Sequence, residues 1–140
     1  MTDLSAQAFQ YWLDKRDCYD GPPDNLPLIG LIWTDPPVIH NTGEGLQKIK
    51  EAWGSHLLTH GKIIYNSNNS RDDNWYNWTE KQILDNSNPG ELVVDCFCGG
   101  STTGVAALRN GRKYYGCDIQ MAALTQSLEN ILNPPEQWLA

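Results

Sequence analysis

The stretch that decides the fold is ELVVDCFCGGSTTGVAALRNGRKYYGCDI, residues 91–119. Apolar residues predict a buried strand over 91–95, which leads into a turn that contains Gly99 and Gly100. Residues 102–110 have the composition of a helix, Gly111 ends it, and 113–118 predict a second strand. A strand, a glycine turn, a helix and a strand make one βαβ unit, so the sequence predicts an α/β fold with a parallel sheet.

The glycine turn has the features of a ligand site. Gly99 and Gly100 would let a ligand approach the backbone closely, and the free N–H groups of the following helix attract an anion. Thr102 and Thr103 are expected to cap that helix. Asp118 ends the next strand about 20 residues after the turn, where a carboxylate commonly binds ribose hydroxyls. We therefore expect a nucleoside ligand.

Two familiar nucleotide motifs fit the turn poorly. A phosphate-binding loop would have Lys after Gly104, where Val105 stands, and a dinucleotide loop would have Gly in place of Ser101. S-adenosylmethionine fits better, because it has a ribose for Asp118 and a carboxylate for the turn. A turn whose glycines only allow tight packing remains an alternative.

A second informative stretch is LIWTDPPVIHN, residues 31–41. An apolar strand over 28–34 ends in Asp35-Pro36-Pro37, where each proline fixes its own φ and restricts the residue before it. The stretch is either a simple strand end with a stiff turn or a pre-organised pocket edge. The presence of the glycine turn in the same chain favours the pocket edge.

The remaining segments complete the predicted order of elements. Helices are predicted over 4–16, 45–58, 80–85 and 121–132, a short strand over 62–65 and a polar loop over 66–77. We predict that four parallel strands lie in the order 113–118, 92–95, 28–34, 62–65. This order is compatible with right-handed crossovers and brings Asp35 and Gly99 to one crevice at the switch point of the sheet.

Composition narrows the class of protein. The 140 residues suit one small compact domain, and no apolar run is long enough for a membrane span. The N-terminus lacks the layout of a signal peptide, and the four cysteines, which lack the spacing of a zinc site, are expected to be reduced thiols of a cytoplasmic protein without a metal. The net charge of −7 opposes tight binding to nucleic acid.

Together the two stretches resemble the DNA amino-methyltransferases that act on adenine N6 or cytosine N4. The family's cofactor motif runs approximately Leu-Asp-Pro-Phe-x-Gly-Ser-Gly-Thr-Thr-Gly, and residues 94–104, VDCFCGGSTTG, follow it. An Asp-Pro-Pro motif that precedes the cofactor motif is typical of the permuted branch. The chain differs from the family at Ser101 and Gly100, which exchange the family's glycine and serine, and at Val38, where the family has an aromatic residue.

The resemblance implies a Rossmann-like methyltransferase fold. The length of the chain predicts a single domain over 1–140 that departs from the family in a reduced number of strands and in having no separate target-recognition domain. The resemblance also implies transfer of a methyl group from S-adenosyl-L-methionine to an exocyclic amine of DNA; RNA, a small nucleotide or a protein amide remain possible acceptors. The acidic net charge predicts that the chain alone would bind DNA weakly, and a homodimer or a partner could supply target recognition. In such a site Asp35, Pro36 and Pro37 would be catalytic. The cofactor would be bound by Asp95, Phe97, Cys98, Gly99, Gly100, Ser101, Thr102, Thr103, Asp118, Ile119 and Lys81.

Two other functions remain open at this point. A catalytically degenerate S-adenosylmethionine-binding module, or a subunit that acts through a partner, would account for Val38 and for the short segment between Val38 and Gly61. A nicotinamide-dependent oxidoreductase fits Ser101 and the Asp-Pro-Pro stretch less well.

Overall fold

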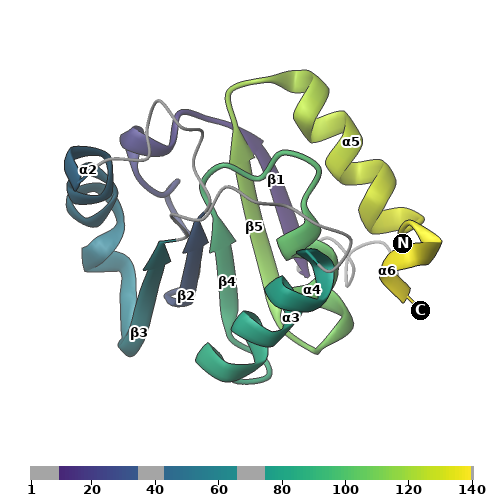
Figure 1. Ribbon diagram of the computed structural model, residues 1–140. Helices are drawn as coiled ribbons and strands as arrows, with labels where there is room; N and C mark the ends of the chain where they lie inside the picture. Colours follow the sequence, from purple (N-terminus) through teal and green to yellow (C-terminus); the bar gives the residue numbers. More distant parts are fainter. Residues whose placement is uncertain (1–9, 35–42, 66–74, 140) are drawn as a thin grey trace.

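A single five-stranded parallel sheet forms the centre of the protein (Figure 1). The computed structural model describes residues 10–34, 43–65 and 75–139. The strands are β1 (Tyr11–Lys15), β2 (Ile29–Thr34), β3 (Leu57–Tyr65), β4 (Leu92–Asp95) and β5 (Lys113–Asp118). They lie in the order β1-β5-β4-β2-β3, and every neighbouring pair is parallel. The predicted order of the last four strands is confirmed, and β1 adds a fifth strand beyond β5.

Helices cover both faces of this sheet. They are α2 (Gly43–Trp53), α3 (Trp75–Asn86), α4 (Thr102–Arg109), α5 (Met121–Leu132) and the short α6 (Glu136–Leu139), with 3-10 turns η1 (Cys18–Asp20) and η3 (Gly54–His56). α2 and η1 contribute to the core on one face, whereas α3, α4 and α5 contribute to the core on the other. The predicted α/β class, a parallel sheet flanked by helices, is confirmed.

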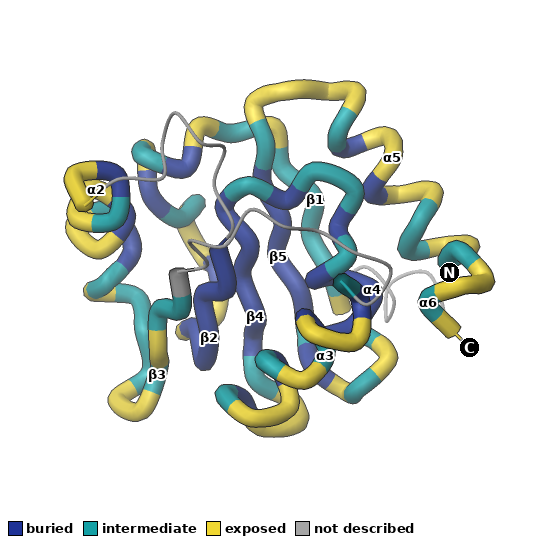
Figure 2. The backbone as a smooth tube through the Cα atoms, viewed as in Figure 1, coloured by how far each residue is buried: buried dark blue, intermediate teal, exposed yellow. Residues whose placement is uncertain are grey.

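Successive side chains of each strand point to opposite faces of the sheet and so form two core layers. Leu31, Val93 and Tyr114 pack towards α3 and α4, and their neighbours Val94 and Tyr115 pack towards α2. The central strands β2, β4 and β5 are almost entirely buried, as Figure 2 shows. Near-continuous apolar runs such as these are expected in a parallel sheet that is covered on both faces.

The helix predicted over 4–16 is wrong from Tyr11 onward, and residues 4–9 lie outside the described part. Residues 11–15 form β1, which pairs in parallel with β5. Tyr11 and Leu13 contact the core layer beneath α4, and Trp12 contacts the opposite layer. This period-2 alternation and the aromatic content favour a strand, and the open edge of β5 supplies its hydrogen-bond partners.

Three predicted boundaries also need correction. The helix predicted over 45–58 ends at Trp53, and residues 57 and 58 already belong to β3, which is therefore longer than predicted. Gly61 lies within β3, where a Cβ atom would meet the carbonyl oxygen of Ile29 at 2.7 Å, so glycine allows a close approach of the two strands there. The helix predicted over 80–85 is longer and begins at Trp75, within the predicted loop.

Across the described residues, no helix combines the length and the apolar character needed to cross a membrane.

Candidate cofactor-binding site

The turn between β4 and α4 is held tightly at both of its ends. The backbone N–H of Cys98 donates to the carbonyl oxygen of Cys117 in β5 at 3.0 Å, and that of Ser101 donates to the carbonyl of Cys98 at 2.7 Å. The carbonyl of Ser101 then accepts the first bond of α4, from the N–H of Val105 at 3.0 Å. The turn is therefore anchored to β5 before the helix begins.

Asp95 stabilises the turn from the end of β4. It is 5% exposed; one carboxylate oxygen accepts from the N–H of Phe97 at 3.1 Å and the other from the hydroxyl of Thr103 at 2.8 Å. The expectation that Thr103 caps α4 is wrong, because its hydroxyl is directed to Asp95. The N-cap position is occupied by Ser101, whose side chain makes no capping bond.

Ser101 has a left-handed backbone, with φ at 58° and ψ at 44°. This conformation costs an L-residue about 1–2 kcal/mol relative to glycine. The fully buried hydroxyl of Ser101 lies 2.8 Å from the hydroxyl of Tyr114 and donates to that of Ser127 at 2.7 Å. Gly99 also has a positive φ, 49°, whereas Gly100 does not. The positions that favour glycine are therefore 99 and 101, and hydrogen bonds stabilise the serine at the second of them.

Asp118 joins the end of β5 to the turn. Its carboxylate accepts from the N–H of Gly99 at 3.2 Å and from the N–H of Gln120 at 3.0 Å. A carboxylate has about four acceptor sites, so lone pairs remain for two ribose hydroxyls. Ile119 follows it with 64% of its surface exposed, which offers an apolar contact beside the acid. Both residues fit a nucleoside ligand.

A small hollow opens over the turn. Seven predicted cofactor residues line it, together with two tryptophans that the sequence analysis did not select: Trp33, Trp75, Asp95, Phe97, Cys98, Gly99, Gly100, Thr102 and Thr103. Its volume is about 50 Å³, so a larger ligand would place only one small group in it. A Cβ atom added to Gly99 would meet nothing within 4 Å among the described residues, so the backbone there is open to a ligand.

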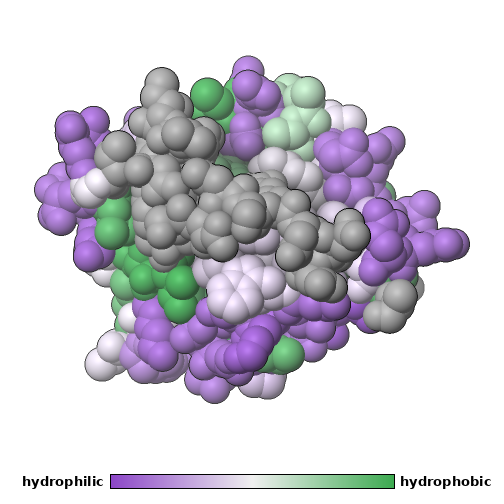
Figure 3. Space-filling view, in the orientation of Figure 1, coloured by the Kyte–Doolittle hydropathy of each residue, from purple (hydrophilic) through white to green (hydrophobic). Residues whose placement is uncertain are grey.

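Of these two tryptophans, the sequence gives a signal for Trp33 but none for Trp75. Trp33 is two residues before Asp35 and ends the apolar run that leads to the Asp-Pro-Pro stretch, whereas Trp75 lies in a segment that was assigned to a loop. In Figure 3 the described surface on this side is largely hydrophilic, and a hydrophobic patch lies over β3 at the edge of the sheet.

Other predicted site residues lie apart from the hollow or outside the described residues. Lys81 is on α3, forms an ion pair with Asp85 at 2.8 Å and does not line the hollow. Asp35, Pro36 and Pro37 lie outside the described residues, as does Val38. The strand before them, β2, ends at Thr34, and it pairs with β4 through Ile32 and Val94.

Cys98 is a protonated thiol at neutral pH. Its burial, with the negative charge of Asp95 in addition, raises the pKa of Cys98 to about 12. All four cysteines are buried and free. In the described ranges, no group of three or more His, Cys, Asp or Glu side chains is arranged to hold a metal ion.

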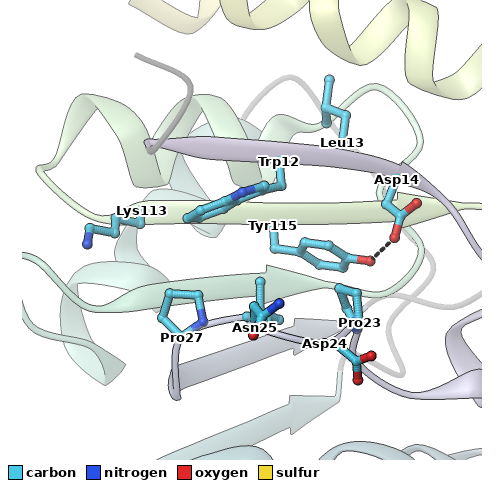
Figure 4. Close-up of a pocket in the computed structure, with 10 residues that line it drawn as sticks. Trp12, Leu13, Asp14, Pro23, Asp24, Asn25, Pro27, Lys113 and Tyr115 are labelled. Atoms are coloured by element: carbon cyan, nitrogen blue, oxygen red, sulfur yellow. Dashed lines mark hydrogen bonds between the residues drawn. The ribbon is translucent and has the colours of Figure 1, made fainter. Parts of the chain in front are cut away.

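A larger pocket, of about 630 Å³, lies elsewhere on the sheet (Figure 4). Trp12 from β1, Tyr115 from β5 and Pro23 and Pro27 from the β1–β2 connection line it. The hydroxyl of Tyr115 donates to Asp14 at 2.6 Å. None of the predicted site residues lines this pocket, and it lies where the β1–β2 connection has only the η1 turn to cover the sheet.

The parallel sheet, the glycine turn beside its central strand and the acid at the end of the next strand define a Rossmann-like nucleoside-cofactor fold. Comparison with known proteins narrows this class. Residues 76–129 match the family model described as DNA methylase. The chain is 42% identical over 48 residues to the type II methyltransferase M1.MboII of Moraxella bovis, and 41% identical over 49 residues to the DNA adenine methyltransferase YhdJ of Escherichia coli K12. These matches confirm the resemblance to the DNA amino-methyltransferases.

The curated matches cover only a part of each protein. They span 34% and 35% of this chain, and 18% and 17% of the two relatives. Similarity of fold to solved structures covers much more of the chain than these sequence matches do. TTHA0409 of Thermus thermophilus, described as a candidate DNA modification methylase, matches 89% of this chain and 95% of its own with a TM-score of 0.69 at 14% identity. M1.HpyAVI matches 88% of this chain and 98% of its own, also with a TM-score of 0.69, at 15% identity.

Proposed function

We propose that the protein binds S-adenosyl-L-methionine and transfers its methyl group to an exocyclic amine of a DNA base, adenine N6 or cytosine N4. The arrangement of β2 beside β4 carries the proposal. Ile32 is paired with Val94, so the chain leaves β2 at the same edge of the sheet where the glycine turn follows β4. The match to the DNA methylase family model covers that turn, and M1.HpyAVI, which has this fold, has been solved in complex with S-adenosylmethionine.

The residues around the turn suit the parts of this cofactor. Asp118 has acceptor sites for ribose hydroxyls, Ile119 offers an apolar surface for a base, and the open backbone at Gly99 suits a small anionic group. When bound, the cofactor would supply an electrophilic methyl group on its sulfonium; transfer to the amine would leave S-adenosylhomocysteine and release one amine proton to solvent. Cys98 lies in the same hollow, but its high pKa keeps it a thiol, so it does not compete with the amine as a thiolate.

Asp35 and the carbonyl of Pro36 are the proposed acceptors for the amine. The lone pair of an exocyclic amine is delocalised into the base, and two acceptors aimed at its N–H groups favour tetrahedral geometry at nitrogen. The prolines limit the conformations of this stretch, which is the requirement for catalysis by positioning.

Binding to DNA is proposed to need help from a second copy or from a basic partner. The net charge is −7, and two of the cations nearest the site in sequence are already engaged. Arg112 is 5% exposed and bonds to Ser87, while Arg109 donates to the hydroxyl of Tyr76 at 2.9 Å. These two arginines are therefore not free to contact phosphates, and with the net negative charge weak, salt-sensitive binding is expected.

The test is methyl incorporation from labelled S-adenosylmethionine into a panel of DNA substrates at low salt. We expect incorporation by the wild type, its loss in Asp35→Ala and its retention in Asp24→Ala, which removes an exposed acid from the β1–β2 connection. Binding of S-adenosylhomocysteine, measured by calorimetry, should be unchanged in both variants. Equal incorporation by the wild type and Asp35→Ala would remove Asp35 from the mechanism.

Val38 favours a second candidate, a cofactor-binding module without activity of its own. The family has an aromatic residue at this position, where it would stack on an extruded base, an interaction worth about 1–3 kcal/mol. Cofactor binding without methyl incorporation on any nucleic acid would support the binding module.

A further inference from the structure

The hydroxyl groups beneath the cofactor turn form a chain with one direction. The hydroxyl of Ser127, on α5, donates to the carbonyl oxygen of Gly99 at 2.6 Å, and the hydroxyl of Ser101 donates to Ser127 at 2.7 Å. Ser101 has thus used its single proton, so the hydroxyl of Tyr114, at 2.8 Å, must be the donor to Ser101. The order is Tyr114 to Ser101 to Ser127 to Gly99.

Burial makes this order a fixed feature of the fold. The three side chains, Tyr114, Ser101 and Ser127, are each fully buried, so water does not compete for their protons. Burial also raises the pKa of Tyr114 well above its usual value, so the first donor of the chain keeps its proton at every physiological pH. Hydrogen bonds arranged in series polarise one another and strengthen the last acceptor contact.

A second side chain of α5 holds the next carbonyl of the turn. Asn130 follows Ser127 by three residues, so the two lie on one face of the helix. Its amide donates to the carbonyl oxygen of Gly100 at 2.8 Å. Two successive carbonyl groups of the turn are therefore bound to α5.

This arrangement determines where the N–H groups of the turn point. In a trans peptide the carbonyl and the following N–H point in opposite directions, so binding of the Gly99 carbonyl to α5 turns the N–H of Gly100 away from that helix. No cis peptide occurs in the described residues. Gly100 and Gly99 line the small hollow over the turn, and the hollow has room for one small group.

We infer that Ser127 and Asn130 are positioning residues for the amino-acid end of S-adenosylmethionine, and that Tyr114 and Ser101 support them. The inference rests on the proposed function. By fixing the carbonyl of Gly99, Ser127 holds the N–H of Gly100 ready to donate to the carboxylate of the ligand, and Asn130 fixes the other side of Gly100 through its carbonyl. The hydrogen bonds beneath the turn also explain how the turn keeps its conformation with serine at position 101, where glycine is favoured.

Two ligands separate positioning from general stability. S-adenosylhomocysteine carries the amino-acid end, whereas 5′-methylthioadenosine has the same adenosine and sulfur without it. Ser127→Ala and Asn130→Ala should each weaken the binding of S-adenosylhomocysteine by about fivefold to tenfold. Both variants should change the affinity for 5′-methylthioadenosine less than twofold. Thr125→Ala is the matched control, because it removes a hydroxyl from the exposed side of the same helix and should change neither affinity.

Calorimetric titration of the full chain with both ligands decides the matter. Asn130 is half-buried, so its variant remains informative if Ser127→Ala does not fold. An equal loss for the two ligands, or no loss for either, would overturn the inference and leave the proposed function standing. Failure of the wild type to bind either ligand would overturn the proposed function and the inference with it.

Discussion

Replacing Gly104 with alanine tests the packing beneath the cofactor motif. A Cβ atom at this position would lie 2.5, 2.7 and 2.9 Å from three atoms of the Tyr114 ring. The ring cannot move away easily, because it is fully buried, its hydroxyl is bonded to Ser101, and it is packed so closely on Gly116 that a Cβ there would lie 2.4 Å from that hydroxyl.

The expected cost follows from two opposing effects. In a helix, alanine is more favourable than glycine by at most about 1 kcal/mol. Overpacking a rigid core typically costs about 1–3 kcal/mol, and the close contacts here place the cost at or above the upper end of that range. We expect Gly104→Ala to lower the free energy of unfolding by about 2 kcal/mol. For a chain of this size that corresponds to a fall in Tm of roughly 8 °C.

Urea denaturation followed by circular dichroism measures the effect. Gly54→Ala is the control, because a methyl group there meets nothing within 4 Å among the described residues and should leave the midpoint almost unchanged. In a Tyr114→Leu background the same Gly104→Ala change should cost less, since the ring that it meets has gone. A Gly104→Ala protein as stable as the wild type would refute this account of the packing.

Three further predictions each concern one side chain. Burial raises the pKa of Asp14, but hydrogen bonds from Tyr115 and Arg16 together with the charge of Arg16 outweigh it and hold the pKa below its usual range. The contribution of Asp14 to stability is therefore present above about pH 4 and lost on acidification. Thermal melts should show Tm falling below about pH 4, and less steeply in Asp14→Asn. Cys98, with a pKa of about 12, should resist iodoacetamide at pH 8 until urea unfolds the chain; full labelling of the native protein would contradict this. Thr103→Val removes the hydroxyl that donates to the buried Asp95 and should cost about 1–3 kcal/mol in urea denaturation, more than Thr102→Val at the half-buried neighbouring position.

The order of four strands could be predicted from the sequence because apolar runs and glycines mark the β4–α4–β5 unit, and right-handed crossovers leave few alternatives. The strand β1 could not, because its short aromatic run fits both a helical and a strand pattern until the free edge of β5 is known. Local pattern alone does not resolve that choice.

The candidate site, like the fold, could be predicted only in part from the sequence. Residues contiguous in the glycine motif do line one hollow, as the motif indicated. Ser127 and Asn130 were not selected, because they act from α5, 26 or more residues along the chain, and contact the turn only after that helix has packed. The hydroxyl of Thr103 was assigned to the wrong acceptor, since the sequence shows a helix start but not the buried Asp95 beside it.

The position of β4 and β5 in the centre of the sheet makes the site a late product of folding. The stretch that matches the DNA methylase family contains these two strands, whereas their outer neighbours β1 and β2 come from residues 11–34. Pairing across such a distance in sequence must overcome the entropy of closing a long loop. Until it happens, the cofactor turn would sit on a ribbon with two open, apolar edges, a form that is prone to pair with other chains. Residues 11–34 thus protect the motif strands from aggregation as well as completing the sheet.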